Sequence, residues 1–287
     1  MKLLTSGILL LTFSLIVNGY NILGIFPHPG KSHFDVFEPL MKELTKRGHQ
    51  VTVISHFPQK RPLPRYEDVS LRNTAPIRMD VFDMNGFKLS RFEQYYDVIN
   101  LMNVGQSSCE NGLSSQPLKD FLSSDRKFDL IITEFFSNEC FLGFVYRFKA
   151  PFIGISSCLL FNWHNDLIGN PSNPSYIPNN FLPLSDKLTF LERVENTILG
   201  IVQNTFVRIF MDNLNSKVAL EVFRNDLPPL RNIAINASLV LVNSHFSLNL
   251  PRPLVPAVIE VGGLHIGEAK KLPQVIIIET NNKIFFV

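Results

Sequence analysis

The sequence predicts an α/β fold in which a parallel sheet carries helices on both faces. Three observations support it: a strand–helix–strand pattern over 21–55, a second over 128–155, and a further short apolar run at 239–243. Two strands joined through a helix run parallel, because the crossover returns the chain to the same end of the sheet. Such strands are covered on both faces and are therefore apolar along their whole length.

The first unit begins with an apolar strand at 21–26, followed by a turn at 27–30. A helix is expected over 32–47 and a second strand over 51–55. Ligands of open α/β sheets bind where the strands end, and His33 emerges there at the amino end of the helix. An imidazole at this edge of the sheet is a candidate for acid–base chemistry.

The second unit contains a strand at 129–133, a helix at 137–149 and a strand at 152–155. Pro151 separates the helix from the last strand, since proline cannot continue a helix. No internal repeat or flexible linker interrupts 20–266, which favours one domain. The apolar face of the helix comprises Phe141, Phe144, Val145 and Phe148.

The spacing of apolar residues over 186–211 predicts a long amphipathic helix with Ser185 as its N-cap. One interpretation, which we favour, is that its apolar face packs onto the sheet. The other is a helix on a membrane surface, with Phe206 and Phe210 in contact with lipid. The apolar positions are Leu188, Leu191, Val194, Ile198, Ile201, Val202 and Ile209, and the flanking cations are Lys187, Arg193 and Arg208.

Composition excludes one class of partner. The formal net charge is only +2 and no run of lysines and arginines occurs, which argues against nucleic-acid binding. Hydrophobic residues make up 45% of the chain and charged residues 18%. That balance suits a large core together with some apolar surface for a membrane or a lipophilic ligand.

The two ends of the chain differ from the part between them. Residues 1–19 have the anatomy of a secretory signal, with a positive start, an apolar run at 8–17 and a small-residue cleavage site. We therefore expect the secretory pathway, with the endoplasmic reticulum lumen, its membrane surface or secretion as the destination. The domain then covers 20–272, and 273–287 is a β-prone tail that is too short to span a membrane.

The three cysteines, Cys109, Cys140 and Cys158, do not make a disulfide framework. Cys140 and Cys158 lie in apolar surroundings and are expected to be buried, although one pair could bridge in an oxidising lumen. Asn236 is the usable glycosylation sequon, but it approaches an expected buried strand, which argues against its occupancy.

An acidic side chain is expected beside His33. Glu134 follows the strand 129–133 and reaches the same sheet edge as His33 if the sheet is parallel. A carboxylate there would accept a hydrogen bond from the imidazole and fix its tautomer. The pair could then take the proton of a hydroxyl group without a metal. Glu139 is the fallback acid, although its place inside the helix favours contact with solvent.

Substrate contacts are expected from the turn and from a loop. Gly30 and Ser32 flank the start of the first helix. The loop 162–176 is polar, follows a strand and holds the single tryptophan, Trp163. Loops in such positions often contact ligands. Specificity for the substrate is expected in loops such as 83–117 and 161–182.

Several other types of site are excluded. The tripeptide at 30–32 resembles the end of a P-loop, but Gly24 lies one residue too far upstream, and Pro27 and Pro29 lack the N–H groups that hold phosphates. No H-x-x-x-H or C-x-x-C motif exists for zinc, and neither D-x-D nor G-x-S-x-G occurs. No metal and no cofactor are therefore expected.

Taken together, these motifs resemble the amino-terminal half of UDP-glycosyltransferases of the animal glucuronosyltransferase type, particularly the insect members. The resemblance covers roughly residues 1–272 and is specific, because several separate motifs occur in the right order. The matching motifs are Gly-Lys-Ser-His-Phe at 30–34, Pro-Leu at 39–40, Arg-Gly-His at 47–49, Gly-Asn-Pro at 169–171, Pro-Ser-Tyr at 174–176, Asn-Ser-His-Phe at 243–246, Pro-Arg-Pro at 251–253 and Val-Gly-Gly-Leu-His at 261–265.

The resemblance implies the amino-terminal half of a GT-B enzyme with two Rossmann-like domains, in which this half binds the acceptor and the other binds the UDP-sugar. It implies that His33 is the general base of an inverting hexosyl or glucuronosyl transfer to the hydroxyl of a small lipophilic acceptor. The family commonly has an aspartate where this chain has Glu134, so the charge is kept on a longer arm.

The resemblance also implies that the donor domain and the membrane anchor are missing, so the isolated chain is expected to be inactive. UDP-glucose or UDP-glucuronic acid would be used only if a donor domain were supplied. Three interpretations follow: a transferase lacking its donor half through an incomplete or alternatively spliced transcript, a non-catalytic acceptor-binding or regulatory half-protein that forms an oligomer with full-length members, or a non-functional remnant.

Overall fold

The computed structural model describes residues 19–77, 93–223 and 226–267. Nearly all of the expected signal segment 1–19 and the whole of the tail 273–287 lie outside the described residues. The expected domain is therefore seen here up to residue 267.

A seven-stranded parallel sheet forms the centre of the structure, with the strand order β3-β2-β1-β4-β5-β6-β7. The predicted α/β class with a parallel sheet is confirmed. The strands are β1 (Asn21–Phe26), β2 (Gln50–Ser55), β3 (Tyr66–Ser70), β4 (Leu130–Glu134), β5 (Phe152–Ser156), β6 (Leu239–Val242) and β7 (Val258–Glu260).

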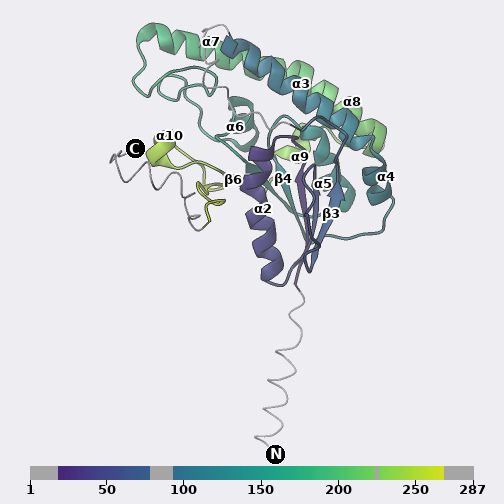
Figure 1. Ribbon diagram of the computed structural model, residues 1–287. Helices are drawn as coiled ribbons and strands as arrows, with labels where there is room; N and C mark the ends of the chain where they lie inside the picture. The colour runs from purple at the N-terminus through teal and green to yellow at the C-terminus, as the bar shows by residue number, and fades with distance from the viewer. Residues whose placement is uncertain (1–18, 78–92, 224–225, 268–287) are drawn as a thin grey trace, which may run out of the picture.

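Helices cover both faces of this sheet, with α2 on one face and α3, α5 and α8 on the other (Figure 1). The helices are α2 (Lys31–Lys46), α3 (Glu93–Leu113), α4 (Gln116–Leu122), the 3₁₀ helix η1 (Glu139–Leu142), α5 (Gly143–Phe148), α6 (Asn162–Ile168), α7 (Phe190–Phe206), the π-helix η2 (Val207–Met211), α8 (Asp212–Phe223), α9 (Leu230–Ala234) and α10 (Phe246–Asn249).

The strand β1 shows why the central strands read as continuous apolar runs. Leu23 and Ile25 enter the core on the face covered by α3, α5 and α8, whereas Ile22 and Phe26 enter the core under α2. Successive side chains of a strand point to opposite faces, so a strand covered on both sides must be apolar at every position.

The connections place a topological switch point between β1 and β4. The chain leaves β1 through α2 toward β2 and β3, and it later returns to the other side of β1 as β4. In open α/β sheets the loops diverge at such a point and leave a crevice at the carboxyl ends of the strands. The residues that follow β1 and β4 therefore meet at this edge.

The predicted helix 137–149 is wrong over its first part. Residues 135–138 form a tight turn, in which Ser137 has a left-handed φ of 54°, and only then does η1 begin. The last turn continues as α5, where Phe144 and Val145 are buried as the periodicity predicts. The turn leaves the side chain of Asn138 buried close to the end of β4, a position that a helix starting at residue 137 would not give it.

The favoured interpretation of the segment 186–211 is also wrong. The helix α7 begins at Phe190, with a capping box between Thr189 and Glu192, and Ser185 is not its N-cap. Its apolar face does not pack onto the sheet, because Leu191 is 76% exposed. The other large apolar side chains exposed on α7 and η2 are Phe190, Val194, Ile198, Ile201, Val202, Phe206, Ile209 and Phe210.

The buried side of α7 carries amides instead. Asn196 Nδ2 donates hydrogen bonds to the carbonyl oxygens of Pro174 and Ile177, at 2.7 and 2.8 Å. Gln203 Oε1 accepts one from Asn179 Nδ2 at 2.6 Å. Because the polar side of α7 is hydrogen-bonded to the loop that precedes the helix, the apolar side of α7 faces outward.

The helix α3 passes so close to the turn after β4 that only glycine fits at position 105. A Cβ atom on Gly105 would lie 1.8 Å from the carbonyl oxygen of Ser137. We expect Gly105→Ala to lower the free energy of unfolding by about 1–3 kcal/mol, since two backbones must separate. Denaturant unfolding measures the change.

Gly200→Ala is the matched control, because Gly200 also lies within a helix but its Cβ would meet only the flexible side chain of Asn162, at 3.3 Å. This substitution should be neutral or stabilise the protein by up to about 1 kcal/mol through helix propensity. Equal effects of the two substitutions would contradict the expected clash.

Candidate functional site

His33 is the third residue of α2, in the first turn of that helix. The preceding residues 27–30 carry the chain from the end of β1 over the edge of the sheet. His33 is held at the switch point by its position in a regular helix, and its side chain is 16% exposed. The His33 side chain is therefore accessible to a reactant.

Glu134 is the last residue of β4. The sequence analysis expected the strand to end at residue 133, with Glu134 directly after it. Its side chain is fully buried, and Oε1 lies 2.7 Å from Nδ1 of His33. An ionised carboxylate can only accept hydrogen bonds, so His33 donates its Nδ1–H and leaves Nε2 as the basic nitrogen. The structure therefore brings together the two residues that the sequence proposed as a pair.

A serine that the sequence analysis missed completes the contacts of the imidazole. Ser157, which follows β5, has its Oγ 2.9 Å from Nδ1 of His33. Since β5 is the neighbour of β4, its end lies at the same edge of the sheet. A polar residue directly after a parallel strand was the signal that could have identified it.

Aromatic rings surround the other faces of His33. The ring of His28 stacks on it with centroids 3.9 Å apart, and Phe136 meets it edge-on at 4.2 Å. Phe136 in turn contacts Phe161, which stacks on Trp163. The imidazole thus lies against an apolar wall that limits the access of water from that side.

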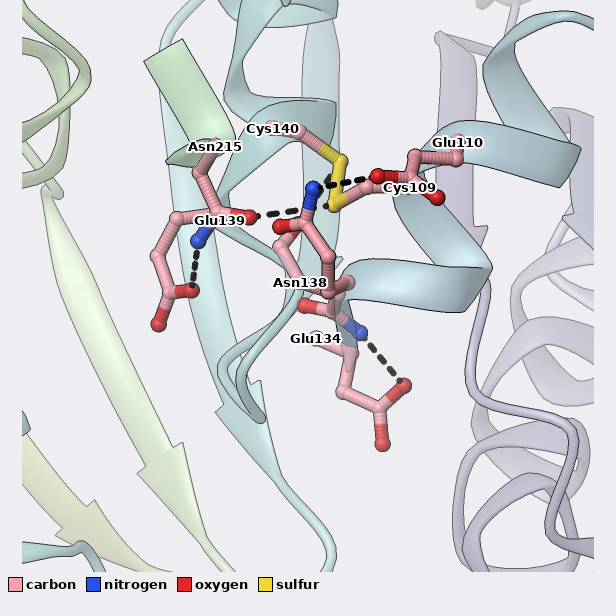
Figure 2. Close-up of a disulfide and its surroundings, with 8 residues drawn as sticks. Cys109, Glu110, Glu134, Asn138, Glu139, Cys140 and Asn215 are labelled. Carbon is pink, nitrogen blue, oxygen red and sulfur yellow. Dashed lines mark hydrogen bonds between the residues drawn. A yellow bond between two sulfur atoms is a disulfide. The ribbon is translucent and has the colours of Figure 1, made fainter. Parts of the chain in front are cut away.

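The fallback acid, Glu139, does not approach His33. Its carboxylate lies 3.1 Å from Nε2 of His164. It also accepts a hydrogen bond from Asn215 Nδ2 at 3.2 Å (Figure 2). It is not a solvent-facing helical residue either, because it joins η1 to α6 and α8. The carboxylate Asp212 lies close to this group, and its pKa is raised to about 6 by its own burial and by the charge of Glu139.

This raised pKa predicts a pH-dependent effect of Asp212→Asn. The native state holds the proton of Asp212 up to about pH 6, whereas the unfolded chain releases it near pH 4, so the contribution of Asp212 to stability falls as the pH rises between these values. The melting temperature of the variant relative to the natural protein should therefore increase from about pH 4 to about pH 7. Asp166→Asn, at an exposed carboxylate, should show no such trend, and a constant difference for both variants would contradict the assignment.

The expected substrate contacts lie in different environments. Gly30 is buried, and its N–H donates to Nδ1 of His28 at 3.0 Å, whereas Ser32 is exposed beside His33. Trp163 does not lie in a loop, because residues 162–168 form α6, and it is only 2% exposed. The structure thus leaves Ser32 accessible and places Trp163 behind Phe161 and Phe136.

A cavity of about 400 Å³ lies beside the turn that precedes His33. It is bounded by Pro29 of that turn and by polar residues of α3, which forms most of the described part of the expected specificity loop 83–117. A larger cavity, of about 520 Å³, lies at the opposite edge of the sheet, where Asn21 and Gln50 begin their strands. Of these two cavities, the first is the one lined by a residue of the turn that precedes His33.

A disulfide joins Cys109 of α3 to Cys140 of η1 (Figure 2). The sequence left the pairing open and expected Cys140 to be simply buried. Both cysteines of the disulfide are fully buried, and Cys158 is the free cysteine among the described residues. Nothing in the spacing of 31 residues marks this pair, so the fold was needed to find it.

Two further features bear on the expected compartment. Asn236 is exposed, so the side chain of the sequon is accessible, contrary to the expected effect of the neighbouring strand. No helix among residues 19–77, 93–223 and 226–267 is long and apolar enough to cross a bilayer.

Comparison with known proteins assigns the family. Residues 25–282 match the family model described as UDP-glucoronosyl and UDP-glucosyl transferase. The chain is 37% identical over 272 residues to UDP-glycosyltransferase UGT5 of Dactylopius coccus, covering 92% of this chain and 51% of that protein. It is 26% identical over 285 residues to UDP-glucuronosyltransferase 1A3 of Rattus norvegicus, covering 94% and 52%.

Among solved structures, that of Arabidopsis thaliana UGT89C1 complexed with UDP-L-rhamnose aligns over 94% of this chain and 56% of its own, with a TM-score of 0.45 and 12% identity. The chain spans about half the length of the curated relatives it matches. With the family model matched over nearly the whole chain, this protein belongs to the UDP-glucuronosyl and UDP-glucosyl transferases and corresponds to their amino-terminal half.

Proposed function

We propose that this chain is the acceptor-binding half of a UDP-glycosyltransferase and that His33 is its general base. The observation that carries the proposal is the 2.7 Å contact between His33 Nδ1 and the buried Glu134 at the switch point of the sheet. A carboxylate in this position fixes the tautomer of the imidazole and directs Nε2 toward a reactant. The domain would extend over residues 20–272.

In the proposed reaction, Nε2 of His33 takes the proton of the acceptor hydroxyl as its oxygen attacks the anomeric carbon of the UDP-sugar. The new carbon–oxygen bond forms on the face opposite the leaving UDP, so the anomeric configuration inverts. Glu134 stabilises the imidazolium that results. The product is a hexoside or glucuronide of the acceptor.

The surroundings of His33 favour a small lipophilic acceptor. Phe136 presents an apolar wall to the imidazole, and the cavity of about 400 Å³ beside Pro29 has the size of a small-molecule site. Of the three residues expected to contact substrate, Gly30 and Ser32 adjoin the base directly. Trp163 would act by supporting the aromatic wall.

In the proposed reaction a second domain holds the UDP-sugar, and the chain described here spans about half the length of the curated relatives it matches. Alignment of donor and acceptor supplies a large part of the rate of such transfers. We therefore expect no transfer by the chain alone, and transfer when the remaining half of UGT5 from Dactylopius coccus is fused to it.

The test is UDP release from UDP-glucose and from UDP-glucuronic acid, in the presence of a panel of phenols, by the chain alone and by the fusion. Release by the fusion that depends on a phenol would support the proposal. Phenol binding by both proteins without release by either would favour the non-catalytic acceptor-binding half. Release by the chain alone would contradict the need for a second domain.

The secretory pathway is the proposed location. The Cys109–Cys140 disulfide and the exposed sequon at Asn236 support it, because disulfides form and accessible sequons are glycosylated in the lumen of this pathway. The exposed apolar face of α7 and η2 suits the surface of a membrane, as the alternative interpretation of that segment predicts.

A further inference from the structure

Glu134 needs a second fixed partner to hold His33. Its side chain is fully buried, and a buried carboxylate is tolerated only where hydrogen bonds satisfy both oxygens. Oε1 accepts from His33, and Oε2 accepts from Nδ2 of Asn138 at 3.3 Å (Figure 2). Asn138 therefore restricts the rotation of the Glu134 carboxylate, which in turn orients the imidazole of His33.

Asn138 is itself 3% exposed. The preceding residue, Ser137, adopts the left-handed conformation and so changes the direction of the chain after β4. This change of direction allows the side-chain amide of Asn138 to reach Glu134. The amide of Asn138 supplies a neutral donor to the buried carboxylate.

Contacts on both sides hold the turn in place. On the amino side, the carbonyl of Ser137 lies against Gly105 of α3. On the carboxyl side, Cys140 is bonded to Cys109 of the same helix (Figure 2). The residues on either side of Asn138 are thus anchored to α3, so its amide has little freedom to leave the carboxylate.

We propose that Asn138 is a positioning residue of the His33–Glu134 pair, and that α3, through Gly105 and the disulfide, holds the turn that presents it. Asn138 keeps Glu134 oriented so that His33 donates its Nδ1–H and exposes a basic Nε2. This proposal rests on the proposed function, because the orientation of Nε2 matters only if His33 accepts a proton.

The experiment is ¹⁵N NMR of the histidine side chains in the full chain, in alkaline buffer where the imidazoles are neutral. The His33 signals are assigned by their loss in His33→Ala. The natural protein should show the Nδ1–H tautomer of His33. Asn138→Ala should convert His33 to a mixture with the Nε2–H tautomer, because Glu134 then rotates away.

Asn215→Ala is the matched control. It removes a buried amide from the carboxylate of Glu139, the first residue of η1, but leaves Asn138 and Glu134 in contact. It should leave the His33 tautomer unchanged. If Asn138→Ala does not fold, Asn138→Leu fills the space with a side chain that cannot donate a hydrogen bond and should give the same mixture.

An unchanged Nδ1–H tautomer in the folded Asn138 variants would overturn the proposal. So would an equal change in Asn215→Ala, since the effect would then come from general loosening of the turn. The readout concerns the imidazole alone, so a lack of sugar transfer in the fusion would refute the proposed function without deciding the role of Asn138.

Discussion

Replacement of His33 by alanine is expected to lower kcat/KM for phenol glycosylation by about 10²- to 10⁴-fold in the protein fused to a donor half. This range corresponds to about 3–5 kcal/mol of lost transition-state stabilisation. The physical reason is the loss of the nitrogen that takes the hydroxyl proton, because nothing in alanine can replace it. Initial rates of UDP release at several phenol concentrations would measure the effect.

His49→Ala is the control for this prediction. His49 lies at the opposite edge of the sheet, where its Nδ1 accepts a hydrogen bond from the N–H of Tyr20 at 3.1 Å. Its removal should leave kcat/KM unchanged. A similar loss in both variants, or a fully active His33→Ala variant, would show that His33 is not the base.

Removal of the disulfide by Cys109→Ala with Cys140→Ala is expected to lower the free energy of unfolding by about 3.5 kcal/mol. The estimate follows from the entropy that a cross-link over 31 residues removes from the unfolded chain. Two filled positions in the core are also emptied, since both cysteines are fully buried. Denaturant unfolding of the oxidised protein and of the double variant measures the difference.

The half-buried free thiol provides the control for the disulfide. Cys158→Ala removes one sulfur atom and no cross-link, and it should change stability by much less. Reduction of the natural protein during unfolding should reproduce most of the loss seen in the double variant. An oxidised protein that unfolds at the same denaturant concentration as the double variant would refute the prediction.

The central part of the fold was predictable because its strands are short and apolar throughout. The first strand was expected at 21–26, and the structure has β1 at the same residues. Because the strands were expected to run parallel, Glu134 and His33 were expected at the same edge of the sheet, and the pairing of β1 with β4 in the structure makes them neighbours. The sequence could not place Ser157 or Asn138 at the same edge, because their side chains depend on the loops that follow the strands.

The segments with an amphipathic pattern were less predictable. The spacing of apolar residues in α7 indicates a helix but not which partner covers its apolar face. Asn196 and Gln203 decided the orientation of α7, because their hydrogen bonds to the preceding loop turn the apolar side outward. Glu139 was likewise expected to face solvent, because a position within a helix does not show which partners lie beside it. The fold places His164 and Asn215 in contact with its carboxylate.

The sequence by itself therefore determined the parallel α/β class, the family and the sheet edge at which His33 and Glu134 meet. These features follow from local apolar runs and from the order of the elements along the chain. The tertiary structure alone decided the partner of Cys109, the contacts of Glu139 and the outward face of α7. Each of these depends on how segments distant in the sequence pack together, which no local pattern encodes.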